Sequence, residues 1–88
     1  MAEREIKLII LSPEKTLFSG MVSRVTLPGA LEPFTVLRAH APIISALQCG
    51  AIKWVADINA EIKISGGFAE VKNNVVTACV ETQEEKQL

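Results

Sequence analysis

The residues best suited to chemistry in this chain are its single histidine, its two cysteines and a few serines. His40 is the natural candidate for a general base, and the nearest carboxylate in sequence is Glu32. A general acid–base pair needs two positioned titratable groups, and neither Ser12 nor Ser45 lies in a GxSxG motif. A histidine followed by Ala-Pro most often lies in a turn, where it packs or forms a hydrogen bond to the backbone. We therefore predict no catalytic residue.

The pattern of cysteines does not indicate a metal site. Cys49 and Cys79 form no CxxC pair, and with one histidine they cannot complete a four-ligand zinc site. We interpret both as small buried side chains; a disulfide between them is possible, but their spacing does not support it. Gly66-Gly67 belongs to neither a GxxxxGK[ST] nor a GxGxxG motif, so no phosphate loop is predicted and no cofactor is expected.

Composition narrows the class of protein. The chain has 88 residues, which suits one small domain, and 49% of them are hydrophobic, which is enough for a core without metal or disulfide. A net charge of −1 and few aromatic residues give no basis for nucleic-acid binding. The charged start is followed by an apolar run too short for a signal peptide or a membrane helix. We expect a reducing, aqueous compartment such as a cytosol.

Short apolar runs bounded by turn residues predict strands rather than helices. In the first run Ile6, Leu8 and Ile10 share one face. Pro42–Leu47 is too short for periodicity to distinguish a helical turn from a strand. The other expected strands are Glu5–Leu11, Met21–Leu27, Phe34–Leu37, Ala51–Val55, Glu61–Ser65, Phe68–Val71 and Val75–Val80.

Turn residues separate these strands. We expect turns at Ser19-Gly20 and Pro28-Gly29, and hairpins around Asp57-Ile58-Asn59 and Lys72-Asn73-Asn74. Gly66-Gly67 predicts a turn or a bulge that needs positive φ.

The fold class is therefore all-β, a small antiparallel β-sandwich or barrel over residues 1–81. A polar tail is expected over residues 82–88. Trp54, on an alternating strand, fits either the core or the centre of an interface.

The order of the motifs resembles one family, the epsilon subunits of F-type ATP synthases. The likeness is to their N-terminal β-sandwich domain and runs from about Ile6 to Glu81, with His40-Ala41-Pro42 and Ser65–Val71 as its most specific pair. The other motifs are Ser12-Pro13-Glu14, Leu17–Gly20, Val25–Gly29, Gly50, Asn74 and Val76-Thr77.

The resemblance implies a non-catalytic rotor component of a proton-translocating ATP synthase. Such a subunit binds the gamma subunit, rests on the membrane ring of c subunits and couples ion flow to ATP synthesis. It implies a bacterial-type peripheral subunit at the cytoplasmic face of the inner or plasma membrane. Two other hypotheses remain: a stand-alone β-sandwich module for a ligand or protein, with exposed aromatics at one edge, and a small hydrolase or metal enzyme using His40.

The resemblance also implies which residues meet these partners. The candidates that face the c-ring are Pro28, Gly29, Ala30, Leu31, Arg38, Ala39 and His40. The candidates that face gamma are Ser12 and Ser45.

The chain departs from the family pattern at several of these positions. Arg38-Ala39 stands where Pro-Gly usually precedes the histidine, and Thr35 follows Phe34 where glycine is usual. Without these glycines the family's backbone cannot be assumed there, and Arg38 is expected to meet an acidic partner loop. Many members continue into a C-terminal helical hairpin that binds ATP in some bacteria. This sequence ends at Leu88, so no nucleotide site and no inhibition by a hairpin are expected.

Overall fold

A computed structural model describes residues 4–83, which form eight strands. The strands are β1 (Ile6–Leu11), β2 (Thr16–Val22), β3 (Arg24–Leu27), β4 (Phe34–Val36), β5 (Ile43–Leu47), β6 (Gly50–Val55), β7 (Asn59–Lys72) and β8 (Val75–Thr82). No helix in this part of the chain is long and apolar enough to cross a membrane. The all-β prediction is confirmed, and the undecided segment Pro42–Leu47 contains a strand.

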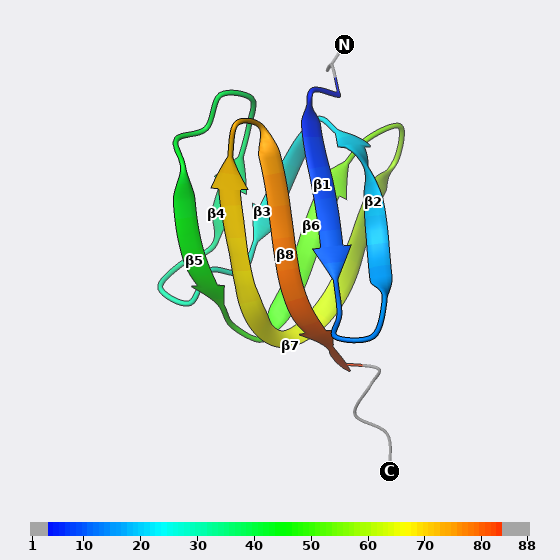
Figure 1. Cartoon of the computed structure of the whole chain (residues 1–88), viewed down its shortest axis with the longest axis vertical. Helices are drawn as coiled ribbons and strands as arrows, with labels where there is room; N and C mark the ends of the chain where they lie inside the picture. Colours follow the sequence, from blue (N-terminus) through cyan, green and yellow to red (C-terminus); the bar gives the residue numbers. More distant parts are fainter. Residues whose placement is uncertain (1–3, 84–88) are drawn as a thin grey trace.

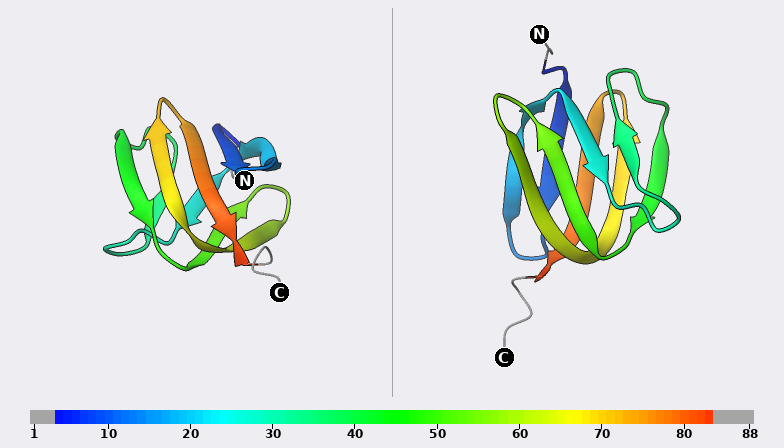
Figure 2. Two further views of the ribbon diagram at one scale, coloured as in Figure 1. Left: turned by 60° about the horizontal axis from the view of Figure 1, so that its bottom comes forward. Right: turned by 180° about the vertical axis from the view of Figure 1, so that it is seen from behind.

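The strands form two layers because β7 is long and bent, as Figures 1 and 2 show. The first half of β7 pairs with β6, and its second half lies between β5 and β8. One layer therefore has the order β5-β7-β8-β1-β2, and the other has the order β7-β6-β3-β4. All pairs are antiparallel except β1 with β8, which are parallel. The purely antiparallel sandwich expected from the sequence is corrected in this one pair.

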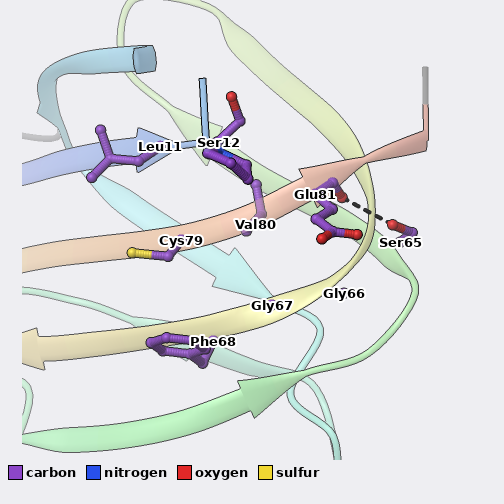
Figure 3. A pocket seen from close by; sticks show the side chains of 10 residues that line it. Leu11, Ser12, Ser65, Gly66, Gly67, Phe68, Cys79, Val80 and Glu81 are labelled. Carbon is purple, nitrogen blue, oxygen red and sulfur yellow. Dashed lines mark hydrogen bonds between the residues drawn. The ribbon is translucent and has the colours of Figure 1, made fainter. Parts of the chain in front are cut away.

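The bend in β7 lies at Gly66-Gly67, directly after Ser65, where the register with β8 shifts between Ile64 and Gly66 (Figure 3). Gly67 has φ of 147°, and a Cβ atom there would lie 2.2 Å from the carbonyl oxygen of Cys79. Only glycine fits this backbone. The predicted bulge is confirmed, and the two predicted strands on either side of it are one continuous strand.

The core lies between the layers and follows the alternation of the strands. Ile6, Leu8 and Ile10 are fully buried, as their shared face predicts. Trp54 is buried as well, and its ring centroid lies 4.6 Å from that of Phe18 on β2. Of the two open interpretations of Trp54, the core position is therefore confirmed.

Two predictions about the second strand are wrong. Ser19-Gly20 is not a turn, because β2 runs through it and Gly20 pairs with Leu8. The ring of Phe18 lies 3.1 Å from where a Cβ of Gly20 would be, so the glycine makes room for the ring. The expected strand Met21–Leu27 is divided at Ser23, whose N–H donates to the carbonyl of Val55.

Both predicted hairpins are present. Asn73 and Asn74 adopt φ of 54° and 63° and connect β7 to β8 in a two-residue turn, as left-handed asparagines allow. The other hairpin connects β6 to β7 through Ala56–Ile58. Strand β8 continues to Thr82, which is buried, one residue beyond the predicted end of the domain. The remainder of the predicted tail, 84–88, lies outside the described residues.

The prediction that both cysteines are buried is wrong. Cys49 and Cys79 are exposed, free thiols. Cys79 lies between buried Ala78 and Val80 on β8, so its side chain points to the opposite face of the strand. The prediction followed the usual burial of the residue type, whereas the alternation of the strand decides the outcome.

Candidate interaction surfaces

The layer β5-β7-β8-β1-β2 presents an apolar face to the outside. We call it the apolar outer face; its apolar residues are Ile9, Leu11, Met21, Ile44, Ala46, Phe68, Val75 and Cys79, and the polar residues Lys7, Ser19, Glu70, Lys72 and Thr77 point outward among them. Ile44 is 77% exposed and Phe68 is 58% exposed. Exposed large apolar side chains gathered on one face of a small protein indicate an interaction surface.

The second layer presents a polar face. We call it the polar outer face, and its residues are Arg24, Thr26, Thr35, Lys53, Glu61 and Lys63. The hydroxyls of Thr26 and Thr35 form a hydrogen bond of 3.0 Å across β3 and β4. This face has the composition of an ordinary solvated surface.

A groove of about 480 Å³ lies at one end of the apolar outer face (Figure 3). Phe68 and Cys79 come from neighbouring strands and form part of its wall, next to Gly67 at the bend of β7. Ser12 lies at the rim, and its hydroxyl oxygen accepts hydrogen bonds from the N–H groups of Glu14 and Lys15. Ser12 thus holds the β1–β2 turn in shape beside the groove.

The loop Pro28–Leu31 is fixed to the end of β5. The N–H of Ala30 donates to the carbonyl of Ala46, and the carbonyl of Pro28 accepts from Gln48. A Cβ on Gly29 would lie 2.4 Å from the carbonyl oxygen of Glu32, so this turn requires glycine. Leu31 follows it and is fully exposed.

The segment Arg38–His40 is held by contacts within the chain. The side chain of Arg38 forms an ion pair of 2.8 Å with Glu5, and the N–H of Ala39 donates to Oδ1 of Asn74 over 2.7 Å. Arg38 thus has an acidic partner within the chain while its side chain is 71% exposed, and its expected contact with an acidic loop of another subunit stays a prediction. Ala39 has φ of 66°, so an alanine adopts the left-handed backbone that glycine favours.

The two groups of predicted ring-facing residues lie at opposite ends of the strands, as Figure 1 shows. Pro28–Leu31 adjoins the last residues of β5, whereas Arg38–His40 precedes β5 and adjoins the turn at Asn73-Asn74. They do not form one surface at one end of the sandwich. Sequence order concealed this because the short strand β4 separates the two groups and carries the chain from one end to the other.

The predicted gamma-facing residues also lie apart. Ser12 lies at the groove of Figure 3, and Ser45 is a half-buried residue of β5 whose hydroxyl donates to the carbonyl of Ala46. Phe68 and Ile44, the most exposed residues of the apolar outer face, were not singled out from the sequence. Their alternation with buried Ala69 and Leu47 was the signal that could have found them.

Within residues 4–83 the surroundings of His40 do not support the enzyme hypothesis. Nδ1 of His40 lies 2.7 Å from the carbonyl oxygen of the adjacent Ala41, which is the backbone contact predicted for it. Within residues 4–83 no three histidine, cysteine or acidic side chains are placed to hold a metal ion. The stand-alone module predicted a cluster of exposed aromatics, but Trp54 and Phe18 pack together inside and only Phe68 is largely exposed.

Comparison with known proteins decides the family. Residues 5–86 match the family model described as the ATP synthase, Delta/Epsilon chain, beta-sandwich domain. The chain belongs to this family. It is 40% identical over 83 residues to the ATP synthase epsilon chain of Lawsonia intracellularis, and 36% identical over 75 residues to that of Chlorobium limicola. These alignments cover 93% and 83% of the chain, and 62% and 85% of the relatives.

Two solved structures confirm the fold. A chain in the central stalk and c-ring structure of Tetrahymena thermophila mitochondrial ATP synthase matches with a TM-score of 0.73 at 17% identity. A chain in the OSCP/F1/c-ring structure of Euglena gracilis mitochondrial ATP synthase matches with a TM-score of 0.81 at 21% identity. They cover 92% and 99% of this chain, and 66% and 59% of those chains. The chain thus spans about 62% of the Lawsonia relative and has the fold of the β-sandwich domain.

Proposed function

We propose that this chain is a non-catalytic rotor subunit of a proton-translocating F-type ATP synthase. It binds the gamma subunit and the c-ring and so couples ion flow to ATP synthesis. Family membership over residues 5–86 is the observation that carries the proposal. The relatives are named ATP synthase epsilon chains, and one structural match comes from a central stalk and c-ring assembly.

The gamma subunit is assigned to the apolar outer face. Burial of exposed apolar area drives association at about 25 cal/mol per Å², and this face carries the exposed large apolar residues Ile44, Phe68 and Met21. Its groove lies beside Ser12, and its edge strand carries Ser45. Ser12 therefore borders this surface, whereas Ser45 pairs with buried Ala69 and its side chain points to the other side of β5.

The c-ring is assigned to the end that carries Pro28–Leu31. Leu31 is fully exposed there on a loop that backbone hydrogen bonds hold to the end of β5, so it is free to contact a partner. At the opposite end Arg38, Ala39 and His40 already have partners in the chain. If a ring meets one end of the sandwich, these three residues face away from it.

The remaining parts of the proposal concern location and ligands. The subunit is peripheral to the membrane through its complex, on the cytoplasmic face. It uses no cofactor and has no ATP site within the sandwich domain, because its role is mechanical coupling through interfaces.

Recovery of assembled partners tests the proposal. A tagged chain expressed in the source organism is solubilised from membranes in mild detergent, and gamma and c subunits are expected in the eluate. Single cysteines at Leu31 and at Arg38, in a background with Cys49→Ser and Cys79→Ser, then report the ring-facing end. Cross-linking to c is expected from Leu31→Cys and not from Arg38→Cys.

Two results would contradict this account. Absence of gamma and c from the eluate, with the tagged chain folded, would remove the rotor assignment. Cross-linking to c from Arg38→Cys alone would keep the rotor assignment and move the ring to the other end of the sandwich.

A further inference from the structure

Two lysines lie in one row of the apolar outer face, at the end of the strands opposite the groove. Val75 on β8 is the cross-strand neighbour of both, since it pairs with Lys7 on β1 and with Lys72 on β7. Figure 1 shows this row next to the turn between β7 and β8, whereas the groove lies where β8 ends. Neighbouring strands lie about 4.8 Å apart, so about 10 Å separates the two lysine backbones. An acidic side chain placed above Val75 can therefore reach both ammonium groups.

Neither Lys7 nor Lys72 forms an ion pair within residues 4–83. Lys7 is half-buried, whereas Lys72 is exposed. Glu70 lies two residues before Lys72 on the same face of β7, but no ion pair joins the two side chains. Two like charges in one row repel each other, so a carboxylate placed between them is stabilised by both. The row therefore offers two cations to an acidic group of a partner.

The row of residues at the groove end of the same face has a different character. Phe68 and Leu11 are both cross-strand neighbours of Cys79, and all three line the groove. Glu81 follows Cys79 on the same face of β8 and also lines the groove, as Figure 3 shows. Cys79 lies four positions after Val75, which corresponds to about 13 Å of strand. The face thus has two cations at one end and an apolar groove with a carboxylate at the other.

We propose that Lys7 and Lys72 bind an acidic side chain of the docking partner above Val75, and that this contact fixes the direction in which the partner lies on the apolar outer face. This proposal rests on the proposed function, under which the partner is the gamma subunit. Gamma then needs an apolar side chain for the groove and an aspartate or glutamate about 13 Å away along the strands. In the reverse direction that carboxylate would lie beside Glu81 and leave both lysines unpaired, so repulsion disfavours it.

Zero-length cross-linking tests the contact directly. A carbodiimide joins an amine to a carboxylate only where the two groups touch. The chain is mixed with purified gamma subunit of the same organism, treated with the carbodiimide and digested, and the linked peptides are identified by mass spectrometry. Lys7 or Lys72 is expected to be joined to an aspartate or glutamate of gamma. Lys63 on the polar outer face is exposed as well and serves as the internal control, with no link to gamma expected.

Charge substitutions test the same contact through binding rates. Lys7→Glu combined with Lys72→Glu should lower the association rate with gamma about tenfold at low ionic strength, and the difference from the parent chain should shrink as salt is added. Lys7→Arg combined with Lys72→Arg keeps both charges, so it should keep the rate within about twofold while the cross-links to gamma are lost. Lys63→Glu is the matched reversal on the other face and should also stay within about twofold. Should the double reversal not fold, cross-linking of the parent chain still decides.

The outcomes distinguish this inference from the proposed function. Gamma binding in which neither lysine is cross-linked and charge reversal leaves the rate unchanged would overturn the inference and leave the rotor assignment intact. No gamma binding at all would overturn both. Charge reversal that abolishes binding to vesicles of phosphatidylglycerol and phosphatidylcholine but leaves gamma binding unchanged would assign the two lysines to a membrane surface, which overturns their assignment to gamma.

Discussion

The two outer faces of the sandwich are built on the same inner alternation but differ in what they present to the outside. Both layers point small and branched apolar residues inward, and Ile6, Val25 and Ile52 are all fully buried. Outward, one layer shows large apolar residues such as Phe68 and Ile44 among its polar ones, whereas the other shows charged side chains such as Lys63. The core requires only the inner alternation, so the apolar outer face must be explained by something other than folding.

Because the two faces differ only outward, the residues that stabilise the fold can be told apart from those that bind a partner. An outward residue contributes little to the core, so its apolar character indicates contact with a partner. Predictions about the two faces therefore concern binding, whereas predictions about the bend that joins them concern stability.

The largest expected effect is at the bend of β7. Gly67→Ala should lower the free energy of unfolding by about 3–5 kcal/mol, because its Cβ would lie 2.2 Å from the carbonyl oxygen of Cys79. Urea denaturation followed by circular dichroism measures it.

Gly66→Ala is the matched control for that substitution. Its Cβ would lie 3.7 Å from the carbonyl oxygen of Leu47, an ordinary contact, and a change below about 1 kcal/mol is expected. Equal losses from the two substitutions would show that the bend does not depend on the backbone of Gly67.

The second-largest expected effect is on affinity for the gamma subunit, and it distinguishes the two outer faces. Phe68→Asp places a charge on the apolar outer face beside its groove, and affinity for gamma should fall about 100-fold, which corresponds to roughly 3 kcal/mol. Lys63→Asp changes the polar outer face and should leave affinity within about threefold, or roughly 0.7 kcal/mol. Surface plasmon resonance with immobilised gamma measures both, and similar losses for the two variants would refute the assignment of the faces.

A smaller effect is expected in the loop before β5. Ala39→Gly should raise the free energy of unfolding by about 0.5–1 kcal/mol, because an alanine at φ of 66° costs about 1–2 kcal/mol, and the greater freedom of glycine in the unfolded chain offsets part of it. Thermal unfolding measures the gain. A lowered melting temperature would mean that the left-handed alanine is not strained.

The smallest effect concerns the ion pair at the same end of the sandwich. Arg38→Ala should cost less than about 1 kcal/mol at low salt, because the Arg38–Glu5 pair is exposed. The difference from the parent chain should shrink as ionic strength rises. A loss that is independent of salt would show that packing of the arginine stem, and not its charge, stabilises this end.

Sequence rules that depend only on neighbouring residues predicted much of the fold, and there is a physical reason for this. The alternation of Ile6, Leu8 and Ile10 and the pair Asn73-Asn74 depend on neighbouring residues alone, so both were predictable. Ser19-Gly20 was wrongly predicted as a turn because Gly20 serves another purpose. It accommodates the ring of Phe18, which lies over it and packs against Trp54. That contact joins distant parts of the chain, and no local rule contains it.

The candidate surfaces were harder to predict than the fold. The loops Pro28–Leu31 and Arg38–His40 are close in sequence, yet the strand between them places them at opposite ends. The partner of Arg38 is Glu5, and that of the Ala39 amide is Asn74, both far away along the chain. Motif order identified the family, but the register of the sheet determines which residues share a surface.

The central claim is that the apolar outer face binds the gamma subunit, and titration calorimetry of the purified chain against gamma tests it most directly. The account predicts saturable 1:1 binding with a negative heat-capacity change, the signature of apolar burial. It also predicts that Phe68→Asp abolishes most of that signal. Absence of binding between two demonstrably folded proteins would contradict the account and favour a stand-alone module with the same fold.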